Sequence, residues 1–318
     1  MLRIILSAVL YIALPFSAHT QTFRVAFWNT ENLFAPQNDS LTNDDEFTPQ
    51  GERHWTFKRY QEKLNGICKT IIALDSPIII GMAEVESEQV MRDLCMGTSL
   101  RRLNYKFVHY DTPDPRGIDN ALLYDSHRYR LISSRPLYLG DSNALQHTRH
   151  QLLAIGVTDD GDTLVTAICH LPSKLGGGKA THIRNLMARQ LRDTLDILRM
   201  QHPNAIVIAM GDFNADPYED AMTKDFGLPC AEWCNLMTDM PEGQGSHKYQ
   251  GAWSYLDQII VSTSKHAQYS AHVFCPDFLL TNDARYLGQK PKRTYNGYRY
   301  QGGISDHLPV YVDILTIH

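Results

Sequence analysis

The sequence predicts an α/β protein in which two β-sheets pack against each other and helices lie outside them. Short apolar runs rich in β-forming residues well outnumber amphipathic helices, and several runs are continuous, as buried strands are. No repeat and no linker-like stretch divides residues 21–318, and the hydrophobic content of 43% is enough for a full core. Two packed sheets fit this excess of strands better than one doubly wound sheet.

The first twenty residues are predicted to be a secretory signal peptide. Arg3 supplies a positive charge, residues 4–16 are almost wholly apolar, and small residues follow from Ser17. The apolar stretch is shorter than the about 20 residues that cross a bilayer comfortably. We therefore expect an exported chain, periplasmic or secreted, that covers residues 21–318 and has no stable membrane insertion. An N-terminal core strand or an uncleaved anchor is the alternative.

The predicted strands are spread over the whole chain. Their ranges are 23–28, 77–83, 105–109, 120–124, 152–157, 163–169, 205–210, 257–261 and 308–314.

Two amphipathic helices are predicted between these strands. The first has apolar residues at 64, 67, 68, 71 and 72 and ends before Pro77. The second begins after glycines 176–178, has apolar residues at 183, 186, 187, 191 and 198, and ends before Pro203. The acidic segment 35–53 is expected to be a solvated surface loop, and residues 276–303 an irregular segment that leads into the last strand.

Charge and cysteine content exclude some classes of protein. The formal charge of −5, which becomes −6 once Arg3 is removed, argues against a wide basic surface for nucleic acid. It does not exclude an enzyme whose metal ion neutralises phosphate locally. Six cysteines without a pair of CxxC motifs make a structural zinc site improbable. A disulfide between Cys230 and Cys234 is left open, and Cys68 and Cys169 are expected to be buried.

The most informative motif is Gly-Asp-Phe-Asn at residues 211–214, directly after the predicted strand 205–210. Asp212 and Asn214 lie two residues apart on an extended turn, so both side chains can point the same way. The carboxylate suits a water or a hard metal, and the amide can donate to a phosphate oxygen. An Asp-x-Asn sequence alone is also a common turn.

A second motif, Ser-Asp-His at residues 305–307, leads into the last strand. Asp306 and His307 are adjacent and point to opposite faces of an extended chain, so Asp306 can serve a metal while His307 takes a proton from water. Asp257, at the start of another buried strand, is the natural carboxylate to orient His307. The alternative for Asp257 is a capping residue at the start of a strand.

Two earlier strand ends contribute oxygen ligands. Asn29 and Glu84 follow separate predicted strands, and a carboxylate with a carboxamide suits Mg²⁺, with Mn²⁺ or Ca²⁺ as alternatives. Glu31 and Glu86 are the competing acids, and each fits a surface or capping position better. His170 ends a further strand, where a lone histidine is structural about as often as functional.

Several enzyme classes find no support in the sequence. It contains no GxxxxGK[ST], no Gly-x-Ser-x-Gly and no His-Glu-x-x-His motif. These absences argue against a nucleotide-binding P-loop, a serine hydrolase and a zinc peptidase.

Together, these motifs resemble the endonuclease/exonuclease/phosphatase superfamily from about Phe23 to Ile314. Residues 45–49, Arg116–Asp119 and 293–295 are similar to its exported bacterial branch. The resemblance implies a four-layer α/β/β/α sandwich. The residues that carry it are Asn29, Glu84, His170, Asp212, Asn214, Asp257, Asp306 and His307.

The resemblance also implies roles. Glu84 would be the main metal ligand, with Asn29 and Asp306 beside it, while Asp212 would position the attacking water or a second metal. Asn214 and His170 would contact the phosphate or assist the leaving group. His307, oriented by Asp257, would be the general base or would polarise the phosphate. Arg116 could reach a phosphate or be a turn residue.

The expected function is that of an exported, Mg²⁺-dependent phosphodiester hydrolase, most simply a monomeric nuclease. A sphingomyelinase-like enzyme or a phosphatase of inositol or sugar phosphates is the alternative, because the charge of −6 also suits small phosphoesters. A catalytically inactive binding module that keeps the fold is a third hypothesis, but it predicts missing ligands, and none is missing.

Overall fold

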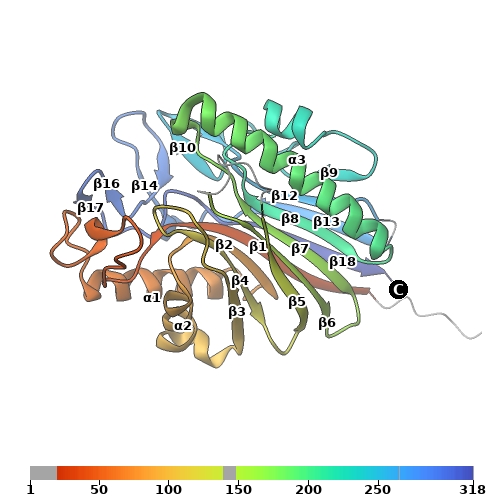
Figure 1. Ribbon diagram of the computed structural model, residues 1–318, viewed down its shortest axis with the longest axis horizontal. Coiled ribbons are helices and arrows are strands. Elements are labelled where there is room, and N and C mark those ends of the chain that lie inside the picture. Colours follow the sequence, from red (N-terminus) through yellow and green to blue (C-terminus); the bar gives the residue numbers. More distant parts are fainter. Residues whose placement is uncertain (1–19, 139–147, 265, 318) are drawn as a thin grey trace, which may run out of the picture.

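A computed structural model describes residues 20–138, 148–264 and 266–317. Two six-stranded sheets stack face to face, and helices cover the outer face of each (Figure 1). The predicted pair of packed sheets and the implied four-layer sandwich are both confirmed.

The first sheet pairs strands from the two ends of the chain, because β1 lies between β18 and β2. Only β1 and β2 run parallel to each other, and the other neighbours are antiparallel. From edge to edge its strands are β13 (Ala267–Val273), β18 (Val310–Ile317), β1 (Thr20–Leu33), β2 (Ile79–Val85), β4 (Asp119–Asp125) and β3 (Tyr105–His109).

The second sheet has the same mixed character, with β7 and β8 as its parallel pair. Its strands in order are β5 (Tyr129–Leu137), β6 (Gln151–Thr158), β7 (Thr163–His170), β8 (Ile206–Asp212), β12 (Asp257–Ser262) and β9 (Trp233–Asn235).

Helices and small ribbons fill the connections. The α-helices are α1 (Phe57–Ala73), α2 (Glu88–Gly97) and α3 (Gly177–Gln201), and the short helical turns are Asp45–Phe47, Ser99–Arg102, Lys174–Gly176, Ala221–Asp225 and Asp277–Leu279. Three two-stranded ribbons pair β10 (His247–Tyr249) with β11 (Ala252–Ser254), β14 (Leu280–Asn282) with β15 (Gln289–Pro291), and β16 (Tyr295–Asn296) with β17 (Arg299–Tyr300).

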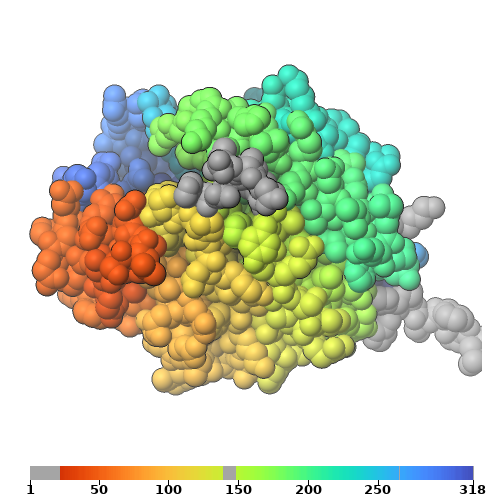
Figure 2. All heavy atoms as spheres, viewed as in Figure 1, coloured from red at the N-terminus to blue at the C-terminus, as the bar shows by residue number. Residues whose placement is uncertain are grey.

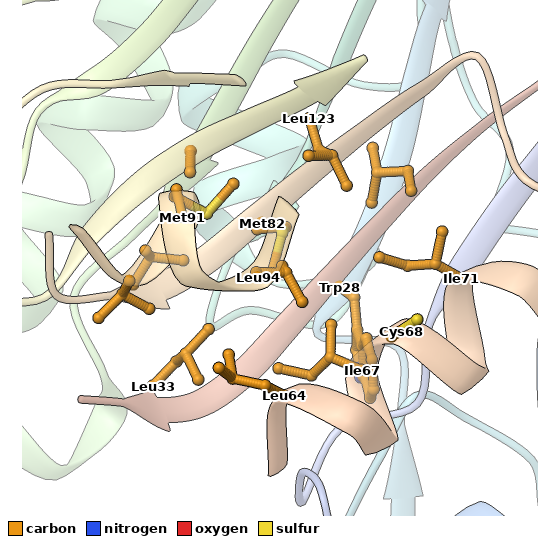
Figure 3. Packing of buried hydrophobic residues seen from close by; sticks show 14 of the residues in the cluster. Trp28, Leu33, Leu64, Ile67, Cys68, Ile71, Met82, Met91, Leu94 and Leu123 are labelled. Carbon is orange, nitrogen blue, oxygen red and sulfur yellow. The ribbon is translucent and has the colours of Figure 1, made fainter. Parts of the chain in front are cut away.

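The predicted apolar face of α1 forms the outer core of the first sheet. The Thr56 hydroxyl accepts a hydrogen bond from the Arg59 N–H and so caps the helix, as helix N-termini require. Leu64, Ile67 and Ile71 then pack in the same buried cluster as Trp28 of β1 (Figure 3). Burying such side chains contributes about 1.5–3 kcal/mol each, so this face fixes α1 on the sheet.

Two further apolar layers complete the core. Between the sheets, Phe27 and Val312 of the first sheet belong to the same buried cluster as Ile168 and Met210 of the second. Helix α3 packs its apolar face, which includes Leu191, on the outer face of the second sheet. Each sheet is therefore buried on both faces, which explains why its strands are continuous apolar runs in the sequence.

The N-terminal and C-terminal parts of the chain meet at one end of the sandwich. In Figure 2 the red-orange segment and the blue segment adjoin on the left of the visible face. There the Arg53 guanidinium donates to the Gly297 carbonyl at 2.9 Å, and the Tyr300 hydroxyl donates to Glu62 at 3.1 Å. This junction holds residues 293–303 against α1.

Some sequence predictions need correction. The segment 35–53 is not wholly a solvated loop, because Asp44 and Phe47 are buried and the Phe47 ring stacks on Phe34 with the centroids 4.3 Å apart. Cys68 and Cys169 are buried as predicted. All six cysteines lie in the described part of the chain and are free, so Cys230 and Cys234 form no disulfide there.

The predicted signal peptide lies outside the described residues except for Thr20, which is the first residue of β1. Within the described ranges, no helix has both the length and the apolar character needed to cross a membrane.

Candidate active site

The predicted functional residues gather where strands of both sheets end. In the second sheet, His170 of β7 is the Cα partner of Asp212 of β8, and Asp212 is the partner of Asp257 of β12. In the first sheet, Asn29 of β1 lies beside Ala83, one residue before Glu84. Strand pairing therefore aligns these residues within each sheet, and the hydrogen bond from the Asn29 amide to Asp212 at 3.0 Å brings the two groups together.

His307 and Asp257 form a buried hydrogen-bonded pair. The His307 Nδ1 lies 2.7 Å from the Asp257 Oδ2. Burial opposes the charged imidazole, but Asp257 and Asp212 outweigh it and raise the pKa of His307 well above its usual range. The second ring nitrogen, Nε2, faces the Asp212 Oδ2 at 3.8 Å. The sequence-based pairing of Asp257 with His307 agrees with this geometry.

Asp212 lies at the centre of the cluster. Its Oδ2 accepts a hydrogen bond from the Asn29 amide at 3.0 Å and lies 3.6 Å from the His170 Nε2. Burial, opposed by the charge on His307 and reinforced by Asp257, raises the pKa of Asp212 to about 7. Asp212 is thus a buried carboxyl group surrounded by two histidines and an amide.

Glu84 offers the oxygen atom best suited to a cation. Its Oε2 accepts the Asn32 N–H at 2.7 Å, but the nearest polar donors to its Oε1 are farther away, Asn29 Nδ2 at 3.5 Å and His170 Nε2 at 3.8 Å. The Oε1 thus has only a long hydrogen bond from Asn29, and the Asp212 Oδ2 faces the same Asn29 amide and the same His170 nitrogen. Asp212, Asp257 and His307 also offer ligand atoms within 4.8 Å of one another. Carboxylate oxygens of this kind fit a hard divalent ion such as Mg²⁺.

Asn29 is oriented differently from the prediction that it offers an oxygen to a metal. Its Nδ2 faces Asp212 and Glu84, while its Oδ1 accepts the Glu31 N–H at 3.0 Å. In this orientation the amide fixes the two carboxylates relative to each other. Its service as a metal ligand stays a prediction.

The guanidinium of Arg293 forms ion pairs with both Asp306 and Glu31. The Arg293 Nη2 lies 2.8 Å from the Asp306 Oδ2, and the Arg293 Nε lies 3.4 Å from the Glu31 Oε1. Burial and the charge of Asp306 raise the pKa of Glu31 to about 7 against the opposing effect of Lys63 and Arg293. Glu31 is buried, so its assignment to a surface or capping position was wrong. Glu86 instead accepts the Ala35 N–H at 2.9 Å, consistent with a structural role.

Positive backbone φ angles mark this edge. Glu31, Asn32, Glu84 and Asn214 have φ of 49°, 53°, 61° and 47°. Such angles are uncommon outside glycine and cost about 1–3 kcal/mol each, so the surrounding structure must impose them. At Asn214, the Asp212 carboxylate accepts the backbone N–H at 2.9 Å and the Leu171 carbonyl accepts the side-chain amide at 2.9 Å.

His170 is held by Arg149, a buried arginine that no sequence motif identifies. The Arg149 guanidinium donates to the carbonyls of His170 and Leu171 at 2.8 and 2.9 Å and to Asp114 at 3.0 Å. Burial, with the charges of Arg149 and Arg116, lowers the pKa of His170 well below its usual value. His170 is therefore a neutral imidazole within this cluster.

Arg116 and His247 lie at the margin of the site. The Arg116 side chain is half-exposed, and its Nε lies 3.5 Å from Asp114 of its own loop, so it is not brought into the central cluster. The His247 ring lies over His307 with the centroids 4.7 Å apart, and burial lowers the pKa of His247 to about 4. His247 follows no recognisable motif, so sequence reasoning missed it.

A second group of residues, His109, Asp111 and Asp119, also offers possible metal ligands away from the central cluster. One ligand atom from each lies within 4.8 Å of the other two. The His109 Nδ1 faces Asp111 at 3.6 Å, and its Nε2 faces Asp119 at 3.7 Å.

Sequence and structure comparisons agree with this geometry. Residues 24–316 match the model of the Endonuclease/Exonuclease/phosphatase family. No curated protein sequence matches the chain.

Three solved structures illustrate the similarity of the fold. D. rerio TDP2 complexed with single-strand DNA product is 17% identical, with 92% of this chain and 98% of that chain covered and a TM-score of 0.58. The human Nocturnin catalytic domain with bound sulfate is 18% identical over 95% and 98%, with a TM-score of 0.56. The Bacteroides thetaiotaomicron mannosyl-6-phosphatase Bt3783 is 15% identical over 92% and 99%, with a TM-score of 0.57.

Proposed function

Because this chain belongs to the Endonuclease/Exonuclease/phosphatase family, we propose that it is an exported, divalent-metal-dependent phosphodiesterase, acting as a monomer, with nucleic acid as its first candidate substrate. The observation that carries the proposal is the buried Asp257–His307 pair facing Asp212, with the Glu84 Oε1 3.8 Å from the His170 Nε2 beside it. Proton-transfer groups and metal-binding oxygens are thus combined at one edge.

Glu84, Asp212 and Asp306 would hold a Mg²⁺ ion, with Asn29 beside them. When bound, the ion supplies positive charge that stabilises negative charge developing on the phosphate. Ca²⁺ and Mn²⁺ also accept such oxygen donors.

Side chains of the protein would transfer the proton and bind the phosphate oxygens. Asp257 fixes the tautomer and ring orientation of His307, so that its Nε2 faces the reacting groups and can hold or move a proton. The neutral His170 and the Asn214 amide would donate hydrogen bonds to phosphate oxygens. Arg116, at the rim, would reach only a substrate that extends beyond the cluster.

A second candidate function is hydrolysis of a small phosphoester. The formal charge of −5 provides no broad basic surface, and a structural neighbour is named a mannosyl-6-phosphatase. A sphingomyelinase-like enzyme or an inositol or sugar phosphate phosphatase therefore remains the alternative. An inactive binding module is disfavoured because the complete set of candidate donors is retained.

A substrate panel tests the proposal. Purified protein is assayed on single- and double-stranded DNA, RNA, sphingomyelin, inositol phosphates, a sugar 6-phosphate and chromogenic mono- and diesters, each with Mg²⁺ and with EDTA. The His307→Ala variant, purified identically, controls for contaminating nucleases. We expect diester cleavage that EDTA abolishes and that the variant lacks. Cleavage of sphingomyelin or of phosphate monoesters, without cleavage of DNA or RNA, would select the second candidate, and no metal-dependent cleavage of any substrate would reject both.

A further inference from the structure

We propose that Arg293 is an internal competitor for the divalent ion: its guanidinium bridges Asp306 and Glu31 in the metal-free protein and is displaced from them when the ion binds. This inference rests on the proposed function, because it concerns the metal affinity of the same site. It assigns to Arg293 a role in setting that affinity rather than in the chemical step.

The contacts of Arg293 place one cation between two acids from different parts of the chain. Its Nη2 pairs with Asp306 at 2.8 Å and its Nε with Glu31 at 3.4 Å. The other Glu31 oxygen accepts the Thr294 N–H at 2.7 Å. A guanidinium presents several donors in one plane, so it can neutralise two carboxylates at once.

Unlike Arg293, the neighbouring Lys63 has no exposed side chain that could move into solvent. Lys63 of α1 is buried, and its ammonium donates to the Glu31 carbonyl and to the Thr294 hydroxyl. The Arg293 side chain is instead 44% exposed. An incoming ion can therefore push the Arg293 head group into solvent, whereas Lys63 is fixed by the structure around it.

Charge compensation gives the sign of the effect. Without Arg293, the repulsion between Asp306 and Glu31 would be offset only by Lys63 beside Glu31 and by His307 beside Asp306, and a divalent ion would relieve it. If Arg293 instead oriented Asp306 for the metal as an outer-shell partner, its removal would weaken binding. The two roles predict opposite changes in affinity.

The test measures Mn²⁺ binding by calorimetry, without substrate, for the wild type, Arg293→Met and Arg293→Lys. Arg299→Met is the matched control, because Arg299 is exposed on the adjoining ribbon and carries the same charge. We expect Arg293→Met to bind Mn²⁺ about tenfold more tightly, equivalent to removing about 1.4 kcal/mol of competition. Arg299→Met should change Kd less than about twofold, since exposed charges are screened, and Arg293→Lys should fall between wild type and Arg293→Met.

Thermal unfolding provides a second readout. In EDTA, Arg293→Met should have a lower Tm than the wild type, and Mn²⁺ should raise its Tm by more, because tighter binding stabilises the folded state more at equal ion concentration. Arg293→Gln replaces Arg293→Met if the latter does not fold.

The outcomes separate this inference from the proposed function. If the wild type binds Mn²⁺ and Arg293→Met binds it equally or more weakly, Arg293 is no competitor and the inference is wrong. If neither protein binds Mn²⁺ at millimolar concentration, the metal-dependent function fails and the inference fails with it.

Discussion

At the scale of single residues, the His307 imidazole is constrained from two directions. Asp257 binds its Nδ1 at 2.7 Å, and the ring of His247 covers one of its faces. The Ser305 hydroxyl accepts the His307 N–H at 3.0 Å and donates to the Asn29 carbonyl at 2.6 Å. These contacts tie the general-base candidate to the strand end that carries the metal-binding candidates.

This arrangement predicts strong coupling between Asp257 and His307. His307→Ala should lower kcat/KM by more than the roughly 10²–10⁴-fold typical of a general base, because we expect His307 to polarise the phosphate as well. Asp257→Asn should cost less, since the imidazole remains but its tautomer is no longer fixed. The double variant should be little worse than His307→Ala alone.

Steady-state kinetics on a chromogenic phosphodiester checks this cycle. Losses that add on a logarithmic scale would mean that Asp257 acts independently of His307. The assignment of the pair as one catalytic unit would then be wrong.

The site residues that could be predicted from the sequence are those that lie next to the ends of buried strands. His170 and Asp212 each end a continuous apolar run and Asp257 begins one, and the pairing of these strands brings the three residues together. Arg149 and Arg293 were not predictable as site residues, because each reaches the site from an irregular segment through tertiary packing. Glu31 was misjudged because its burial depends on Thr294 and Arg293, more than 260 positions away along the chain.

At the scale of elements, the close approach of β7 and β8 positions His170 next to Asp212. Gly211 is the Cα partner of Cys169 in this parallel pair. A Cβ at Gly211 would collide with the carbonyl oxygen and the Sγ of Cys169. Only glycine therefore permits this spacing directly before Asp212.

Gly211→Ala should destabilise the protein by about 1–3 kcal/mol or more, as overpacked core positions do, and should also lower activity by shifting Asp212. Gly178→Ala is the control, because nothing lies within 4 Å of its Cβ position in α3. That substitution should be neutral or stabilising by up to about 1 kcal/mol. Chemical denaturation measures both, and equal stabilities of the two variants would contradict the steric argument.

Asp119, the first residue of β4, should make the free energy of unfolding depend on pH. Burial raises the pKa of Asp119 to about 7, with Thr112 opposing the shift and Asp111 adding to it. An unfolded aspartate titrates near pH 3.9. The protonated group therefore stabilises the fold below about pH 4, and this contribution is lost as the pH rises to about 7.

Asp119→Asn should remove this dependence. The free energy of unfolding of the variant minus that of the wild type should increase by on the order of 1–3 kcal/mol from pH 4 to pH 7.5. Denaturation at each pH measures this difference. The control Asp111→Asn changes a side chain that is 89% exposed and should stay within about 0.5 kcal/mol. A constant difference between Asp119→Asn and the wild type across this range would refute the prediction.

The strands and the helix that were not predicted from the sequence have weak hydrophobic patterns. The strands β5 and β13 are both edge strands with many exposed positions, so they lack the apolar run of a central strand. Helix α2 has only ten residues, of which four are buried apolar residues. Central strands and long amphipathic helices were predictable because burial on both faces, or along one full face, leaves a strong pattern in the sequence.

At the scale of the whole molecule, export remains a prediction from residues 1–20. If it is correct, the mature chain begins between about Ala18 and Phe23, because the apolar stretch ends at Phe16. Mass spectrometry of the protein from its native host measures this directly. An intact Met1 would contradict export through a cleaved signal peptide.

The central claim is that this edge of the sandwich is a metal-dependent phosphoesterase site. Its most direct test is the turnover of Glu84→Gln at saturating Mg²⁺ on the best substrate of the panel. We predict a loss of about 10³-fold or more, because the metal's charge stabilisation contributes several kcal/mol to the transition state, together with unchanged circular dichroism. Near-wild-type turnover by the folded variant would contradict the claim and remove Glu84 from the site.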